Sequence, residues 1–241
     1  MDAYVQKRVQ GKYNKLTADL GLNEVGCFVE HVEDAHANFL ADSAYYGNVA
    51  WITAQMRRMQ YEHNQLGYVP DRLMNWAGRK IEKMPLDKAI HTIDKYIKPL
   101  NTRQKAFACF KTVASDKGSM INLIETANCD YNEEVLVSDA VDIVSEWRCY
   151  IHEGEIRGAF NYKGNLRVHP NYNDIDVMIK DFTTTDSPIA YALDVYINTH
   201  GETLVMEVND VMSLGWYGLT PVYAGRMIVD RWEQIHKNKK S

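Results

Sequence analysis

Apolar and polar residues alternate most regularly near the C-terminus, over residues 191–210. Both halves of this stretch are rich in Val, Ile, Leu and Tyr, and His200-Gly201 lies between them, where a two-residue turn is expected. The pattern predicts a β-hairpin with this turn at its tip. In that register Asp194 lies directly opposite Glu207.

The same register groups polar side chains on one face of the hairpin. Because side chains alternate along a strand, Glu207 and Asn209 share a face, and Ala192 lies opposite Asn209. Like charges opposed across a strand pair are destabilising, so Asp194 and Glu207 require a cation between them. A hard divalent ion with oxygen ligands, such as Mg²⁺ carrying a phosphate, meets that requirement. The alternative is a solvated amphipathic hairpin whose acids face water.

A second hairpin is predicted from residues 143–151 and 156–162, with Glu153-Gly154 as its turn. Alternation places Glu146 and Arg148 on the same face of the first strand. The guanidinium can reach outward because its expected partner is small, but the alternative is a surface ion pair with Glu146, which contributes little. The turn predicts two opposed pairs: Arg148 with Ala159, and Glu146 with Asn161.

The remaining pattern divides the chain near residue 90. Helical spacing predicts helices at 35–40, 49–65, 71–82, 177–182 and 222–237, with 1–20 as a helix or a loose arm. Short strands are predicted at 25–32, 92–98, 106–113 and 135–138, and polar loops at 116–120 (a candidate lid), 163–176 and 215–218. We therefore expect a small mixed lobe over 1–90, in contact with a second domain over 91–241.

The composition narrows the class of protein. The chain has 241 residues, of which 46% are hydrophobic and 24% are charged, enough for one large domain or two packed lobes. A net charge of −5 argues against broad nucleic-acid binding. Four widely spaced cysteines and the lack of a secretory leader or membrane-length apolar run predict a cytoplasmic protein with reduced thiols.

Two lysines are candidates for phosphate binding. Lys98 ends a strand immediately before Pro99, and Lys105 follows within a loop. Lysine acts on phosphate as a compact point charge, although a lysine taken singly is more often a solvated surface residue.

Taken in order, these elements resemble an ATP-grasp domain. The likeness rests on Lys98 in a strand, Glu146-x-Arg148 in a later strand, and Asp194 followed by Glu207-x-Asn209. More narrowly, four segments look like a compact branch of that family that is common in phage genomes and is described by its characteristic arginine and lysines. They are Tyr-Ile-Lys98-Pro, Lys105-Ala-Phe, Ser-Glu146-Trp-Arg148 and Glu207-Val-Asn209-Asp210, and the resemblance spans residues 93–232.

The resemblance implies an α+β fold, in which two α/β lobes with antiparallel sheets clamp ATP and are preceded in the chain by a small mixed N-terminal lobe. It also implies a role for each matching residue. Lys98 and Lys105 hold the ATP phosphates, Glu146 takes a ribose hydroxyl, and Arg148 steadies the γ-phosphate or an acyl phosphate. Asp194, Glu207 and Asn209 hold Mg²⁺. The hinge that reads adenine through its backbone is Val135, Leu136, Val137 and Ser138.

The resemblance further implies a carboxylate–amine ligase that uses ATP and Mg²⁺ to form an amide through an acyl phosphate, releasing ADP and phosphate. Its substrates are small molecules or peptides, bordered by four candidate residues: Arg167, Ser213, Gly215 and Tyr217. The setting is the cytoplasm, or the host cytoplasm for a phage-encoded chain, with no membrane partner.

Two departures from the family pattern keep other functions open. Ala192 stands where many ATP-grasp ligases have a basic residue, and Val211 stands where a glycine often follows the metal strand. One alternative is therefore a Mg-ATP-binding regulatory or partner-binding module without ligase turnover. The other is a structural protein with a fortuitous hairpin.

Overall fold

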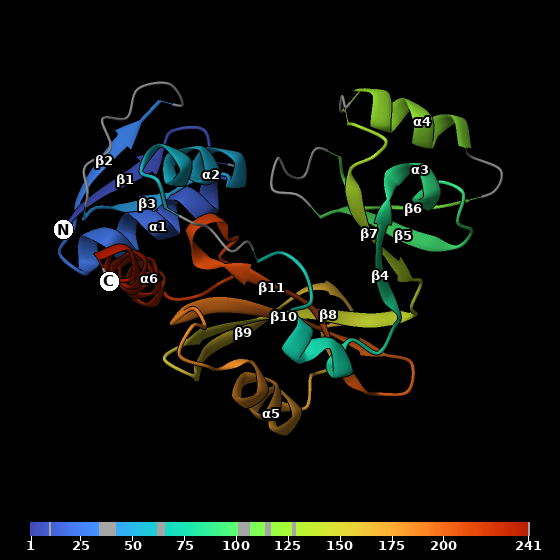
Figure 1. The fold of residues 1–241 in the computed structure, drawn as a ribbon. Coiled ribbons are helices and arrows are strands. Elements are labelled where there is room, and N and C mark those ends of the chain that lie inside the picture. The colour runs from blue at the N-terminus through green and yellow to red at the C-terminus, as the bar shows by residue number, and fades with distance from the viewer. Residues whose placement is uncertain are drawn as a thin grey trace. The chain divides into compact units, whose positions relative to one another are not determined.

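The computed structural model describes residues 1–9, 11–33, 42–61, 66–100, 107–113, 117–126 and 129–240. These form two compact units (Figure 1), one comprising Met1–Trp76 and Ile143–Ser241 and the other Ala77–Asp142. This grouping differs from the expected division at residue 90, because the N-terminal segment packs with the C-terminal helix. The helix expected at 35–40 and Lys105 lie outside the described residues.

The first unit begins with a three-stranded parallel sheet in the order β2-β1-β3. The strands are β1 (Asp2–Gln6), β2 (Phe28–Val32) and β3 (Ala44–Tyr46), and the accompanying helices are α1 (Lys12–Glu24) and α2 (Val49–Arg58). A helix or loose arm was expected over 1–20, and β1 corrects that expectation. Four of its five residues are buried in succession, so it lacks the polar–apolar alternation that identifies a half-exposed strand.

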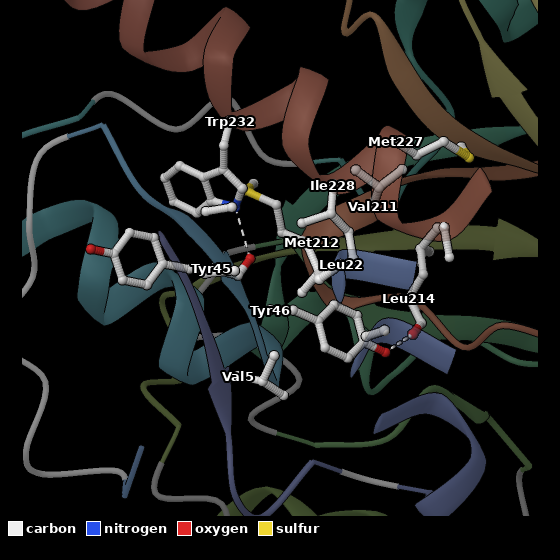
Figure 2. Close-up of a cluster of buried hydrophobic side chains, with 14 of the residues drawn as sticks. Val5, Leu22, Tyr45, Tyr46, Val211, Met212, Leu214, Met227, Ile228 and Trp232 are labelled. Atoms are coloured by element: carbon white, nitrogen blue, oxygen red, sulfur yellow. Dashed lines mark hydrogen bonds between the residues drawn. The ribbon is translucent and has the colours of Figure 1, made fainter. Parts of the chain in front are cut away.

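Aliphatic and aromatic side chains together fill the core beside this sheet (Figure 2). The indole N–H of Trp232, from the long helix α6 (Pro221–Lys240), donates to the backbone oxygen of Tyr45 at 2.7 Å. The hydroxyl of Tyr46 donates to the backbone oxygen of Leu214 at 2.6 Å. These bonds give the buried polar ends of the rings partners, as buried Tyr and Trp require.

A second sheet carries the polar hairpins, in the antiparallel order β11-β10-β8-β9. Its strands are β8 (Ile143–His152), β9 (Glu155–Gly164), β10 (Ala190–Asn198) and β11 (Thr203–Asp210). The helix α5 (Tyr172–Phe182) precedes β10, and the 3₁₀ turn η2 (Val211–Ser213) follows β11. The predicted helix at 177–182 is thus the second half of α5, which takes up part of the loop expected at 163–176.

The C-terminal hairpin has the predicted pairing at its acidic end, where Asp194 pairs with Glu207 and Ala192 with Asn209. The turn itself is longer than predicted, because Asn198 pairs with Glu202 around a three-residue loop containing Gly201 in the left-handed region. Strand β11 contains one extra residue opposite the step from Val195 to Asp194 on β10. This bulge restores the predicted register at Asp194.

The other hairpin has the predicted turn but not the predicted pairs. Glu153 and Gly154 both have positive φ, as a two-residue hairpin turn requires. A bulge near Ile151 then shifts the register, so Arg148 pairs with Phe160 rather than Ala159. A second bulge pairs Glu146 with Lys163 rather than Asn161. Both expected pairs were therefore wrong, because a regular register was assumed.

The second unit contains a four-stranded antiparallel sheet in the order β4-β7-β5-β6. The strands are β4 (Ile81–Pro85), β5 (Lys95–Pro99), β6 (Phe110–Lys111) and β7 (Glu134–Asp139), accompanied by α3 (Leu86–Ala89) and α4 (Lys117–Thr126). The helix expected at 71–82 was wrong in its second half, since the 3₁₀ helix η1 (Asp71–Trp76) ends before β4. Residues 117–120 of the expected lid loop begin α4.

None of the helices among the described residues is long and apolar enough to cross a membrane.

Two glycines set the contact between α1 and α6. A methyl group built on Gly225 would lie 2.1 Å from the backbone oxygen of Gly21, too close to be accommodated without moving a helix. We predict that Gly225→Ala lowers the free energy of unfolding by about 1–3 kcal/mol, because overpacking forces backbone shifts. Urea denaturation measures the change. Gly118→Ala is the control, since nothing lies within 4 Å of its added methyl group, and an equal loss in both variants would contradict the prediction.

Candidate functional site

Polar side chains from three adjacent strands meet on one face of the second sheet. Arg148 on β8 pairs with Asp194 on β10, which pairs in turn with Glu207 on β11. Asp194 is only 2% exposed and Arg148 only 8% exposed. The predicted alternation on β8 and the predicted acidic pair are both present, so the sheet brings together residues that lie up to 59 positions apart in the chain.

Arg148 binds Asp194 through two parallel hydrogen bonds. Its Nε donates to Oδ1 and its Nη2 to Oδ2, each at 2.7 Å. Nη1 donates to the backbone oxygen of Gly215 at 3.2 Å. Burial alone would lower the pKa of Arg148, but the hydrogen bonds and the charge of Asp194 outweigh burial and raise it above its ordinary value. The guanidinium is therefore charged at any ordinary pH.

Asn209 links the two carboxylates. Its Nδ2 donates to Asp194 Oδ2 at 3.1 Å and to Glu207 Oε1 at 2.9 Å. The amide group therefore stands between the two acids, where its N–H groups reduce the repulsion that opposed carboxylates produce.

Two tyrosine rings cover the guanidinium. The rings of Tyr162 and Tyr217 stack with centroids 5.2 Å apart, and Arg148 lies 5.0 Å from the Tyr217 centroid and 5.9 Å from the Tyr162 centroid. Both distances are within the range of cation–π attraction. Burial raises the pKa of Tyr162, and the charges of Asp194 and Glu146 raise it further, so its phenol stays protonated at neutral pH.

Glu146 forms a second ion pair beside this cluster. It is 6% exposed, and its Oε1 accepts a hydrogen bond from Lys163 Nζ at 2.6 Å. The side chain of Lys163 is 70% exposed, so one end of this pair reaches water. The expectation that Glu146 takes a ribose hydroxyl stays a prediction, and the structure adds that this carboxylate already has a cationic partner.

The loop after η2 is held by side chains from distant elements. The hydroxyl of Tyr150 donates to the backbone oxygen of Gly215 at 2.6 Å and accepts from the backbone N–H of Tyr217 at 2.9 Å. Asn14 on α1 accepts from the backbone N–H of Trp216 at 2.9 Å. The loop is thus fixed, while Tyr217 remains 47% exposed.

The other predicted nucleotide residues lie in the second unit. Lys98 on β5 pairs with Leu136 on β7. Val135–Ser138 lie within β7, which is paired with β4 on one side and β5 on the other, so their backbone groups have ladder partners. Adenine recognition by these residues stays a prediction. The segment 140–142, which follows β7 outside the ladder, is an additional candidate.

The structure places the remaining substrate candidates in two different regions. Gly215 and Tyr217 contact the guanidinium, and Ser213 ends η2 just before them. Arg167 lies in an exposed turn after β9, where its backbone N–H donates to Asn165 at 3.0 Å. Its role in substrate binding stays a prediction.

Tyr162 and Lys163 are members of the cluster that the sequence pattern did not reveal. Regular alternation would send adjacent residues to opposite faces of β9. The bulge between the pairs Trp147–Asn161 and Glu146–Lys163 turns both side chains to the face of Glu146. Arg157 is the extra residue at the other bulge of β9. A sequence pattern read with a fixed period of two cannot detect such insertions.

The donor set fits a hard divalent cation. Among the described residues, no group of three or more His, Cys, Asp and Glu side chains is arranged to hold a metal. Asp194 and Glu207 instead provide two carboxylates, and Asn209 provides an amide whose oxygen can replace its N–H groups by rotation of the amide. Oxygen donors of this kind suit Mg²⁺, which commonly takes its other ligands from phosphate and water.

The sequence and the fold together identify the family. The family model that matches residues 76–227 is described as an ATP-grasp domain, family 2 of a clade whose label combines the one-letter codes of arginine and lysine. The chain therefore belongs to this family of ATP-grasp domains, and it has the ATP-grasp fold of mixed α/β content with antiparallel sheets. No curated protein matches the chain by sequence.

Solved structures show the same fold over nearly the whole chain. D-cycloserine synthetase DcsG has a TM-score of 0.58 at 11% identity, covering 96% of this chain and 100% of that chain. D-alanine–D-alanine ligase from Bacillus anthracis, solved with ATP, has a TM-score of 0.54 at 12% identity, with 99% of each chain covered. A RimK domain ATP-grasp protein from Sphaerobacter thermophilus has a TM-score of 0.56 at 12% identity, covering 97% and 100%.

The buried ion pair predicts a specific loss of stability. Arg148→Met leaves the Asp194 carboxylate buried without its main partner, and we expect the free energy of unfolding to fall by about 3–5 kcal/mol. Adding Asp194→Leu should recover most of that loss, because the uncompensated charge is then removed. Arg157→Met removes a more exposed guanidinium that pairs with Glu155, so a change within about 1 kcal/mol is expected. Urea denaturation that shows equal losses for the two arginine variants would contradict this account.

Proposed function

We propose that this protein is an ATP-dependent ligase that joins a carboxylate to an amine and releases ADP and phosphate. The observation that carries the proposal is the meeting of Asp194, Glu207 and Asn209 on one face of the sheet, in a chain of the ATP-grasp family. Two fold neighbours, a D-cycloserine synthetase and a D-alanine–D-alanine ligase, are named for syntheses of this general kind.

The reaction has two steps in which atoms balance. A carboxylate oxygen of the first substrate attacks the γ-phosphorus of ATP, and the bond to the β,γ-bridging oxygen breaks to give an acyl phosphate and ADP. The amine of the second substrate then attacks the acyl carbon, phosphate leaves, and the amine loses a proton to give the amide. Most of the acceleration in such reactions comes from positioning and charge stabilisation.

Individual residues are proposed for these tasks. Asp194, Glu207 and Asn209 would hold Mg²⁺, which when bound neutralises charge on the phosphates. Lys98 would hold a phosphate as a point charge. Lys163, which pairs with Glu146 in the first unit, is a further basic candidate, since its side chain reaches solvent. The adenine would contact the chain at β7 or at the segment 140–142 that follows it.

The substrates would meet the loop after η2. Gly215 and Tyr217 border the polar cluster, and Ser213 comes just before them. The backbone from Gly215 to Tyr217 is fixed by Tyr150 and Asn14. A fixed loop holds a small-molecule or peptide substrate in one orientation, which is where much of a ligase's rate enhancement originates. Arg167 stays a more distant candidate for this role.

A second candidate function is a Mg-ATP-binding module without turnover. It is motivated by Ala192 and Val211, which stand where family members often have a basic residue and a glycine. Both residues are fully buried, so neither presents a functional group to a substrate. Calorimetry with Mg-ATP and a screen for ADP release over pairs of acids and amines separate the two functions: binding without release favours the module.

The acidic hairpin gives the sharpest test. Glu207→Gln should abolish ADP release from Mg-ATP in the presence of substrates while leaving the circular dichroism spectrum unchanged, because the amide cannot supply the negative charge that Mg²⁺ needs. Glu202→Gln is the matched control, since Glu202 lies on the same hairpin but in its exposed loop. Turnover that persists in Glu207→Gln would disprove the assignment.

Lys98 provides an independent test of nucleotide binding. Loss of one charge-assisted hydrogen bond weakens binding by about 1.5–3 kcal/mol, so we expect Lys98→Ala to raise the Kd for ATP by about 10-fold to 150-fold. Isothermal titration calorimetry measures the change. Lys111→Ala should leave the Kd unchanged, because Lys111 pairs with Asp94. Equal effects of the two substitutions would indicate a general loss of positive charge rather than a contact with phosphate.

A further inference from the structure

Arg148 is held on several sides by groups of its own chain. Two of its nitrogens donate to the carboxylate of Asp194 and the third to the backbone oxygen of Gly215. The rings of Tyr162 and Tyr217 stack beside it, both within 6 Å of the guanidinium carbon. A side chain with this set of contacts has one favoured orientation, and turning it toward a ligand would break the bidentate pair.

The carboxylate of Asp194 depends on this contact more than on any other. Asp194 is 2% exposed, so water does little to stabilise its charge, and Glu207 lies directly opposite it. Both carboxylate oxygens accept a hydrogen bond from the guanidinium at 2.7 Å. The flat fork of the guanidinium therefore sets the plane of both oxygens, which a single ammonium group cannot do.

The exposed cation of the cluster differs from Arg148 in each of these respects. Nζ of Lys163 donates to Glu146 at 2.6 Å, and 70% of its side chain is exposed. It can change partner at little expense, because a partly solvated ion pair contributes little stability. The two basic residues on this face are therefore suited to different tasks: one is fixed to a carboxylate and the other can move to an incoming anion.

We infer that Arg148 is a positioning residue that orients Asp194 for the cation, and that it does not bind phosphate directly. The inference rests on the proposed function, since it takes Asp194 as a ligand of Mg²⁺. It changes the role that the family resemblance gives to Arg148, from steadying a phosphate to fixing a carboxylate. Groups that orient metal ligands in this way commonly change metal affinity by about 10-fold to 100-fold when they are replaced.

The test separates metal binding from nucleotide binding. Mn²⁺ is titrated into the full chain in the presence of the non-hydrolysable ATP analogue AMP-PNP and followed by electron paramagnetic resonance. AMP-PNP is titrated separately, without metal, by calorimetry. Arg148→Lys keeps the charge but removes the fork. Arg157→Lys is the matched control, because Arg157 is an arginine on the neighbouring strand β9 with its own ion pair to Glu155 at 2.7 Å.

We expect Arg148→Lys to weaken Mn²⁺ binding about 10-fold to 100-fold and to leave the metal-free affinity for AMP-PNP within about twofold of the wild type. Arg157→Lys should match the wild type in both titrations. A comparable loss of metal-free AMP-PNP affinity in Arg148→Lys would overturn the inference alone, because it would show a direct contact with phosphate. A wild-type chain that binds neither Mn²⁺ nor AMP-PNP would overturn the proposed function and the inference together.

A crystal structure of the wild type with Mn²⁺ and AMP-PNP tests the inference without any substitution, should Arg148→Lys fail to fold. Nε and Nη2 of Arg148 that remain on Asp194, with Mn²⁺ on the same carboxylate, would support it. A guanidinium turned away from Asp194 onto the phosphates would overturn it.

Discussion

Asp194 has almost no contact with water and faces a second carboxylate across a strand pair, so its charge depends on a guanidinium from the next strand. Each neighbouring feature follows from that dependence. The bidentate pair fixes Arg148, and the fixed guanidinium lies within 6 Å of two stacked tyrosine rings and donates an N–H to the oxygen of Gly215. Buried ion pairs are costly to break rather than strongly stabilising, so this arrangement favours one geometry over others.

The same contact connects two parts of the proposed site. Arg148 touches Asp194 at one end and the loop of Gly215 at the other, and that loop is also tied to Tyr150 on β8. The carboxylate proposed to bind the cation and the loop proposed to border the substrate therefore share one anchor. In a ligase, a common anchor keeps the phosphoryl group and the attacking amine in a constant relative position through both steps.

The pairing at the acidic end of the C-terminal hairpin was predicted correctly from the sequence, but the longer loop and the bulge that produce it were not. The loop is one residue longer than expected and β11 contains one extra residue, and these two offsets cancel at Asp194. On β8 and β9 the offsets do not cancel, so the partners expected for Glu146 and Arg148 were wrong. The parallel strand β1 was missed because its continuous burial gives no alternation to detect.

Contacts between elements far apart in the chain could not be predicted from the sequence. Nothing in the pattern places Gly215 beside Arg148, because the two lie 67 positions apart and the loop owes its shape to Tyr150 and Asn14. Tyr162 could not be assigned to the cluster without knowledge of the bulge, because the expected pairing of Glu146 with Asn161 sends Tyr162 to the opposite face.

The extra residue on β11 also decides which side of the sheet is polar. Val205 pairs with Val195, whereas Glu207, only two positions further, pairs with Asp194 on the opposite face. Val208, which pairs with Leu193, stays on the apolar face with Val205, while Glu207 and Asn209 are turned to the other face. A single inserted residue in an ancestral strand is sufficient to move a whole set of side chains from one surface to the other, so a chemical site of this type can originate by insertion without any change of residue type.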